Sequence, residues 1–288
     1  NQEIKIGSKI KDIKTNLGNF GVNKWGDVFY QEINQTKEGF KVLGGNEIQK
    51  YYQRGIKGYI ENKFIKTNQS LIKPNSILLQ RIISHIENPT DHLKIAGTIF
   101  EDADYKIVNT IHQLTLNEEL SNKYVLAVIN SKFMNWFVYR FVFAKAIRSF
   151  QFSGDVAKKI PIPKISPDEQ RPFVEKADEM LNLNKEFYEK KSKFLNRVHE
   201  LGIEKISKKM DKFFKLSFDE FVKELLKQKI NLNLKQKDEW EDYFENYKKE
   251  LSDLKEKIDK TDSEIDKMVY TLYGLNEKEI KIVEESLK

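Results

Sequence analysis

The chain has 288 residues, of which 39% are hydrophobic and 12% aromatic, so it is long enough for two domains and too apolar to be disordered. It contains no cysteine, no secretory signal and no apolar run as long as a membrane span, which argues against a disulfide scaffold and a membrane partner and favours a cytoplasmic protein. Because the first residue is Asn1 rather than Met, we expect a fragment or a processed product.

Charge and glycine content change near Pro161-Ile162-Pro163. Residues 1–165 hold 24 Lys and Arg against 15 Asp and Glu, whereas residues 166–288 hold 26 against 29. Eleven of the 13 glycines lie in the first part. We therefore predict two domains, a basic head (1–165) suited to a polyanion and a near-neutral helical domain (166–288) suited to a protein partner.

Residues 1–120 are expected to form short strands between turns that recur about every ten residues. The β-rich pieces are 28–30, 40–43, 77–79, 95–100 and 107–111. From Ser121 the pattern becomes helical, with one broad apolar face that would pack on a sheet. That face comprises Tyr124, Val128, Ile129, Phe133, Trp136, Phe137 and Phe141. The predicted fold class is α+β, a mixed head followed by an all-α antiparallel coiled-coil stalk.

The helical domain carries clear start and stop signals. Ser166, Pro167 and Glu169 form a capping box, Gly202 is a stop, and Ser217 with Glu220 opens a second helix. The first long helix has apolar positions at Val174, Ala177, Leu181, Tyr188, Leu195 and Val198, with Phe173, Met180, Phe187, Phe194 and Leu201 beside them. A heptad seam then follows at Trp240, Phe244, Tyr247, Leu251, Leu254, Ile258, Thr261, Ile265, Met268 and Leu272. We expect 168–201 and 236–272 to pack antiparallel.

Catalytic motifs are missing from the sequence. It has no Walker loop, dinucleotide fingerprint, nucleophile elbow or amino-methyltransferase signature, and its four histidines lack metal-site spacing. Glu61-Asn62-Lys63 with Asp27 has the spacing of a Mg²⁺ nuclease, but Glu-x-Lys is common in a Lys-rich chain. We expect no catalysis, metal or cofactor in this chain alone.

Basic residues interleaved with aromatics and amides are the stronger signal. Lys and Arg neutralise phosphates, while Arg and Gln can pair with base edges in the major groove of double-stranded DNA. The candidate DNA contacts are Lys50, Tyr51, Arg54, Lys57, Lys63, Arg81, Lys145, Arg148 and Gln151. In the alternative interpretation Tyr51 is a core residue, the cations form a solvated face, and Arg81 braces the fold, paired with Glu101 or Asp104.

Several segments resemble one known family. They are Leu43-Gly44-Gly45-Asn46-Glu47-Ile48 followed by Tyr51, Ile77-Leu78-Leu79-Gln80-Arg81, the 124–132 helix, Ile160-Pro161-Ile162-Pro163 with Glu169-Gln170, and the closing segment 265–283 around Leu272-Tyr273-Gly274-Leu275. Together they resemble the TaqI-like C-terminal specificity domain, or target recognition domain, of type IIG restriction-modification enzymes and DNA adenine methyltransferases. They are similar, more distantly, to half of a type I specificity subunit.

The resemblance implies a DNA-recognition module whose catalytic partner lies elsewhere. S-adenosylmethionine and Mg²⁺ would belong to methyltransferase and nuclease domains outside this chain, joined to it in cis or in trans. A type I-like subunit would instead dock separate methyltransferase chains through its coiled coil. A coiled-coil scaffold that binds no DNA is the third possibility.

Overall fold

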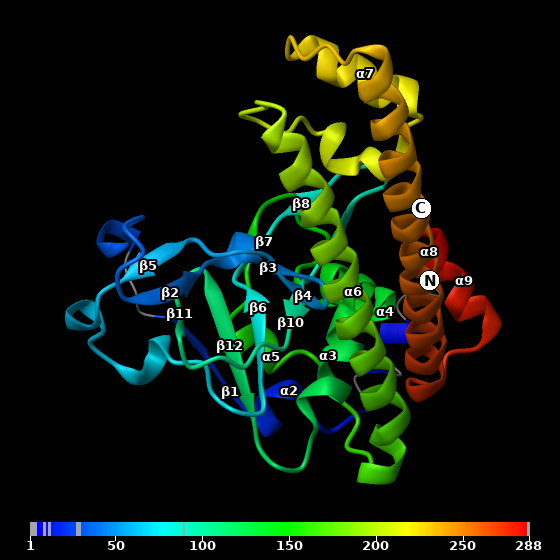
Figure 1. Cartoon of the computed structure of the whole chain (residues 1–288). Coiled ribbons are helices and arrows are strands. Elements are labelled where there is room, and N and C mark those ends of the chain that lie inside the picture. Colours follow the sequence, from blue (N-terminus) through cyan, green and yellow to red (C-terminus); the bar gives the residue numbers. More distant parts are fainter. Residues whose placement is uncertain (1–4, 8–9, 11–12, 27–29, 89, 287–288) are drawn as a thin grey trace. The chain divides into compact units, whose positions relative to one another are not determined.

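The computed structural model describes residues 5–7, 10, 13–26, 30–88 and 90–286 (Figure 1). Contacts divide the chain into two compact units, residues 1–181 with 262–288 (unit 1) and residues 182–261 (unit 2). The two long helices each contribute to both units. This division by contacts is a different one from the compositional division at residue 165, which stays a prediction.

The strands are short and lie in unit 1. They are β1 (Gly21–Trp25), β2 (Phe40–Leu43), β3 (Ile48–Gln49), β4 (Tyr52–Gln53), β5 (Gly58–Ile60), β6 (Ser76–Gln80), β7 (Ile82–Ile83), β8 (His85–Ile86), β9 (His92–Leu93), β10 (Gly97–Thr98), β11 (Tyr105–Ile107), β12 (Ile111–Leu116) and β13 (Phe150–Gln151). The helices are α2 (Leu17–Phe20), α3 (Asn122–Asn130), α4 (Lys132–Phe137), α5 (Gly154–Ala157), α6 (Pro167–Glu200), α7 (Phe218–Lys227), α8 (Leu234–Leu272) and α9 (Glu277–Glu285).

The largest sheet is antiparallel in the order β1-β12-β6-β10. The strand predicted at 77–79 is confirmed as the buried part of β6. The strand predicted at 107–111 is wrong, because the amide of Ile111 donates to the carbonyl of Val108 at 3.0 Å and turns the chain there. The apolar run therefore supplies the end of β11 and the start of β12, which belong to different sheets.

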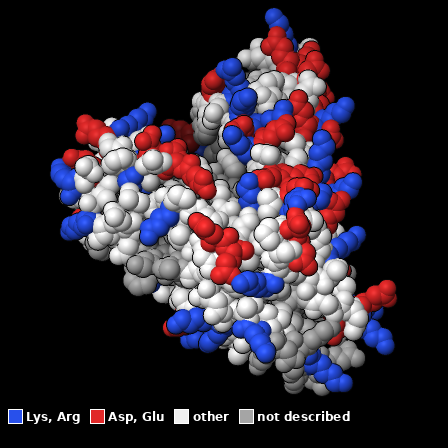
Figure 2. All heavy atoms as spheres, turned by 90° about the horizontal axis from the view of Figure 1, so that it is seen from below, with Lys and Arg blue, Asp and Glu red and all other residues white. Residues whose placement is uncertain are grey.

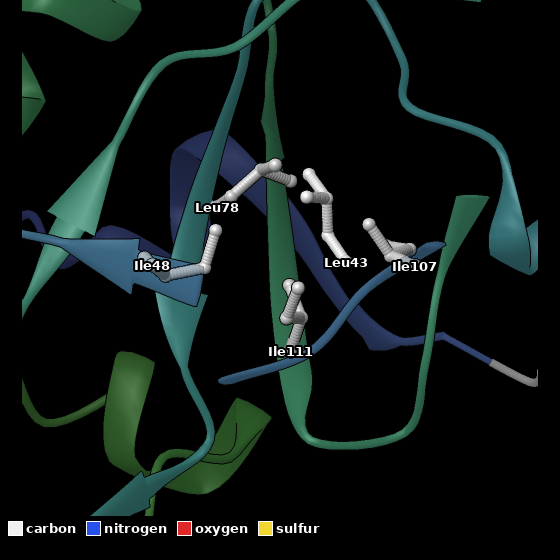
Figure 3. Packing of buried hydrophobic residues seen from close by; sticks show 5 residues of the cluster. All are labelled: Leu43, Ile48, Leu78, Ile107 and Ile111. Atoms are coloured by element: carbon white, nitrogen blue, oxygen red, sulfur yellow. The ribbon is translucent and has the colours of Figure 1, made fainter. Parts of the chain in front are cut away.

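A second sheet has the order β11-β2-β5, with β11 parallel to β2, and β2 is the strand predicted at 40–43. Buried side chains from both sheets meet in one cluster, shown in Figure 3: Leu43, Ile48, Leu78, Ile107 and Ile111. This cluster fixes the β2–β3 turn and the β11–β12 turn against β6. Both turns border the candidate site described below.

Two further expectations differ from the structure. Of the strand expected at 95–100, only Gly97 and Thr98 pair in a ladder, as β10. A strand is also expected at 28–30. Residues 28 and 29 lie outside the described residues, and Tyr30 begins a 3-10 turn.

The helix expected from Ser121 is present but is interrupted at Ser131. The hydroxyl of Ser131 accepts from the amide of Met134 at 3.1 Å and so starts α4. Asn130 meanwhile makes two hydrogen bonds to the backbone of Gly97, at 3.0 and 3.1 Å. These bonds satisfy the amide inside the core and fasten α3 to β10.

The capping boxes and the heptad pattern are confirmed. Ser166 and Glu169 exchange hydrogen bonds before α6, and α6 ends just before Gly202, whose φ is 91°. In unit 1 the Lys176 ammonium lies 2.6 Å from the Glu264 carboxylate, and in unit 2 Lys190 lies 2.8 Å from Glu250. The residue numbers of the partners on α8 thus decrease as those on α6 increase, so the two helices run antiparallel. The fold is α+β.

The buried face of α6 includes polar residues that the apolar pattern did not predict, namely Gln170, Asn184 and Lys191. Asn184 and Lys191 are buried in line with Met180, Phe187 and Phe194. The Lys191 ammonium lies 2.8 Å from an Asp211 carboxylate oxygen, so this charge is paired. Across the helices that the structure describes, none is long and apolar enough to cross a membrane.

Candidate nucleic-acid interface

Acidic and basic side chains are interspersed on the face drawn in Figure 2. The positive excess of the head does not gather there into one continuous patch. A candidate interface must therefore be located residue by residue, from exposure and from contacts.

The β7–β13 ribbon brings together two parts of the predicted set. β13 pairs antiparallel with β7, with Gln151 opposite Ile82 and Phe150 opposite Ile83. Alternate residues of a strand point to opposite faces. Ile83 and Phe150 are buried, whereas Gln151 and Ile82 are exposed, the latter to 50%. The ribbon therefore presents one mixed polar and apolar pair outward.

Arg81 is held beside this pair. Its guanidinium donates to the Gln151 side-chain oxygen at 3.1 Å and to the Asn109 carbonyl at 2.9 Å. Its backbone amide donates to the carbonyl of Thr110 at 2.9 Å. Arg81 thus braces the fold through Asn109 and also contacts a second candidate residue, whereas its expected pairing with Glu101 or Asp104 stays a prediction.

The loop before β13 carries Lys145 and Arg148, both exposed. Ala144 and Lys145 have left-handed backbones, with φ of 51° and 58°, and the Lys145 amide donates to Tyr139 at 2.9 Å. The Arg148 guanidinium lies 5.7 Å from the centroid of the Phe150 ring, a cation–π distance. These contacts fix the loop beside the ribbon.

Arg54 and Lys57 lie in the loop after β4, where Arg54 is exposed. The amide of Arg54 donates to the carbonyl of Glu47 at 2.7 Å, so this loop lies against the turn that contains Gly45. The Thr110 hydroxyl accepts from the amide of Gly45 at 2.9 Å, while its carbonyl accepts from Arg81. A Cβ placed on Gly44 would come within 3.0 Å of the Lys57 side chain. The loop that carries Arg54 and Lys57 is therefore linked to Arg81 through the Gly45 turn and Thr110.

Lys50 and Tyr51 lie elsewhere in unit 1. The Lys50 ammonium contacts both oxygens of Asp262 at 2.6 and 2.7 Å, and Tyr51 is 1% exposed. Asp266, one turn further along α8, accepts from the amide of Lys132 at 2.8 Å. The pair therefore anchors the end of α8 to the head, as the core interpretation expected of Tyr51, and we leave both residues out of the interface.

Lys63 is exposed, lies 2.8 Å from the Glu61 carboxylate and sits over the Phe64 ring. Neither of these contacts joins it to the ribbon. Asp27, the other carboxylate of the nuclease motif, lies outside the described residues. Within the described part of the chain, no three His, Asp or Glu side chains are placed to hold a metal ion.

His112 lies beneath the interface, in β12, and is 2% exposed. Burial and the positive charge of Arg81 lower the pKa of His112 from 6.5 to about 4. The folded state thus binds a proton less readily than the unfolded chain. Stability from this residue is complete above pH 6.5 and is lost as the pH falls toward 4.

We expect the parent to lose about 2 kcal/mol between pH 7 and pH 5 through His112 alone. Urea titrations across this range should show that loss in the parent and a flatter dependence in His112→Gln. An NMR titration of the His112 ring in the folded parent gives an independent measurement. A titration midpoint near 6.5 would contradict the burial argument.

The sequence did not single out the two exposed isoleucines. Ile82 directly follows Arg81, and Ile147, 68% exposed, directly precedes Arg148. A strand rich in isoleucine normally indicates core, so composition gave no reason to place them outside. Only the pairing of β7 with β13 shows which isoleucine of 82–83 faces outward.

Comparisons with known proteins give matches of two kinds, a family model and solved structures. The family model of a domain of unknown function (DUF8810) matches residues 166–269. Among solved structures, the chain is similar to the HsdS subunit from Thermoanaerobacter tengcongensis, with 14% sequence identity and a TM-score of 0.33. That match covers 62% of this chain and 42% of the HsdS chain, so it spans less than half of that subunit. No curated protein is significantly similar to the chain.

Proposed function

We propose that this chain is a sequence-specific DNA recognition module of a restriction-modification system. The observation that supports it most is the β7–β13 ribbon, where Arg81 and Gln151 meet at 3.1 Å. The major groove of B-DNA admits a two-stranded β-ribbon, and Arg and Gln are suited to the edges of guanine and adenine. The motif resemblance given above adds independent support.

The local charge favours a polyanion. Segments 76–86 and 143–153, which form the ribbon and its flanks, contain Arg81, Lys145 and Arg148 and no aspartate or glutamate. Arg54 and Lys57 add two cations from the loop that lies against the Gly45 turn, and the amide of Gly45 donates to Thr110. Cations placed on either side of a ribbon would bind the phosphates that border the groove, while the ribbon contacts base edges.

The variant Arg148→Ala tests whether the Arg148 side chain contacts the edge of a base. We expect a pool of random duplexes selected by the parent to show a preferred sequence, and Arg148→Ala to lose preference at one base pair. Each such contact contributes roughly 1–3 kcal/mol of discrimination. Arg197→Ala, an exposed arginine of unit 2, is the matched control. An unchanged motif with uniformly weaker binding would make Arg148 a phosphate contact.

We further propose that the chain supplies binding and not chemistry. Incubated with S-adenosylmethionine or Mg²⁺ and mixed duplex DNA, it should neither methylate nor cut, as methyl-transfer and gel assays would record. Cleavage that Glu61→Ala abolishes would overturn this proposal. The finer proposal is that the catalytic domains are fused upstream, as in type IIG enzymes.

A type I-like specificity subunit is the alternative form of the same function. There the α6/α8 pair would dock separate methyltransferase chains. The native coding sequence distinguishes the two, because a methyltransferase read in frame upstream of residue 1 supports the fused form. Copurification with a separately encoded methyltransferase supports the other.

A further inference from the structure

The outward pair of the β7–β13 ribbon has an unusual composition for a solvated surface. Gln151 and Ile82 stand directly opposite each other, and the isoleucine keeps half of its surface exposed. Opposite residues of an antiparallel pair have Cβ atoms about 4.5–5.5 Å apart. One amide and one aliphatic side chain are therefore presented together.

The amide is oriented. A guanidinium only donates hydrogen bonds, so the Gln151 atom that lies 3.1 Å from Arg81 is the side-chain oxygen. Arg81 is itself held by the Asn109 carbonyl at 2.9 Å, and its own carbonyl accepts from the Phe152 amide at 2.7 Å. Gln151 thus has a defined oxygen side and a defined amine side before any ligand binds.

An adenine–thymine pair offers the matching groups. In the major groove, adenine presents N7 as an acceptor and N6 as a donor, which a glutamine amide pairs with in a bidentate manner. The thymine of the same pair presents its C5-methyl group, which aliphatic side chains contact. A guanine–cytosine pair has no such methyl group, and its exocyclic amine would lose water against Ile82 without gaining a hydrogen bond.

We propose that Gln151 and Ile82 read one adenine–thymine pair together, Gln151 at the adenine edge and Ile82 at the thymine methyl group. This inference rests on the proposed DNA-recognition function and names the bases that the ribbon selects. The flanking cations Arg81, Lys145 and Arg148 favour a nucleic acid over an apolar protein partner as the ligand of Ile82.

Uracil tests the methyl contact, because it differs from thymine only by that group. In a duplex selected by the parent, we replace each thymine with uracil in turn and measure the dissociation constant by titration. At one position the parent should bind about three- to five-fold more weakly, the effect of one buried methyl group. Ile82→Ala should be insensitive to that replacement, and Ile147→Ala, which alters the other exposed isoleucine, should keep the parental sensitivity.

The adenine contact has a matching test. Replacing the adenine of the same pair with 7-deazaadenine removes N7, which should weaken binding by the parent and leave binding by Gln151→Ala unchanged. Sensitivity at the same pair in both experiments supports joint reading of that pair. Circular dichroism of each variant establishes that it is folded before binding is compared.

The outcomes separate the inference from the function on which it rests. If the folded parent selects no preferred duplex, the proposed function fails. If it selects a duplex but no uracil replacement weakens binding, or Ile82→Ala remains equally sensitive, the inference fails and the function stands. DNA binding that Ile82→Ala leaves wholly unchanged would overturn the inference.

Discussion

Leu254→Asp should lower the free energy of unfolding by several kcal/mol. Leu254 is 5% exposed and lies in the α8 seam between Leu251 and Ile258, both buried. A carboxylate at this position would be removed from water, which is costly for a charged group. Losses of this size arise from the burial of an unpaired charge. Urea denaturation followed by circular dichroism should record a much lower midpoint.

The matched control is Ser252→Asp, which adds the same charge to the same helix at an exposed position. We expect that variant to change stability by less than about 0.5 kcal/mol, as most surface substitutions do. If Leu254→Asp unfolds at the parental midpoint, the heptad seam of α8 is not a packing surface. Equal losses in both variants would point to helix charge rather than burial.

Features set by neighbouring residues were predictable from the sequence. The capping boxes at Ser166 and Ser217 depend on a residue three positions away, and both form. The α8 seam is buried from Phe244 to Ile265 at the predicted heptad positions, except at Tyr247, which is half-buried. Local spacing carries this information because a helix brings residues three and four apart onto one face.

The seam of α6 shows where periodicity misleads. Its apolar pattern gives two adjacent stripes, and most of the main stripe is only half-buried, although Ala177 and Val198 are buried. The buried residues placed beside that stripe include Phe173, Met180 and Phe187. Asn184 and Lys191 are also buried on this face, so a count of apolar residues alone underestimates how much of α6 is buried. Lys191 is tolerated there because Asp211, from a different segment, pairs with its charge.

The candidate interface depended on long-range pairing, which no local pattern encodes. Arg81 and Gln151 were both candidates, but their contact joins residues 70 apart in the chain. Lys50 was indistinguishable in sequence from Lys57, and only its contact with Asp262, 212 residues away, shows that it anchors α8. Charge and composition therefore nominated the candidate segments, and the tertiary contacts show which of their members lie together.

DNA binding should weaken steeply with added salt. A protein that neutralises six to ten phosphates loses about 10³–10⁵-fold in affinity between 50 and 200 mM salt, because bound counterions are released. The excess of cations over anions in residues 1–165, 24 against 15, makes a dependence of this kind the expected result. Titration of the chain against one duplex at several salt concentrations gives the slope directly.

Lys145 and Lys57 are the residues whose neutralisation should change that slope. Each Gln variant is expected to bind all sequences more weakly and to flatten the slope of log affinity against log salt by about one unit, as for the loss of one phosphate contact. Lys235→Gln, at an exposed position of unit 2, should leave the slope unchanged. Equal flattening in all three variants would trace the dependence to net charge rather than to the ribbon and its flanks. A folded parent that binds no duplex at low salt would favour the scaffold, because the basic excess would then have no polyanion to neutralise.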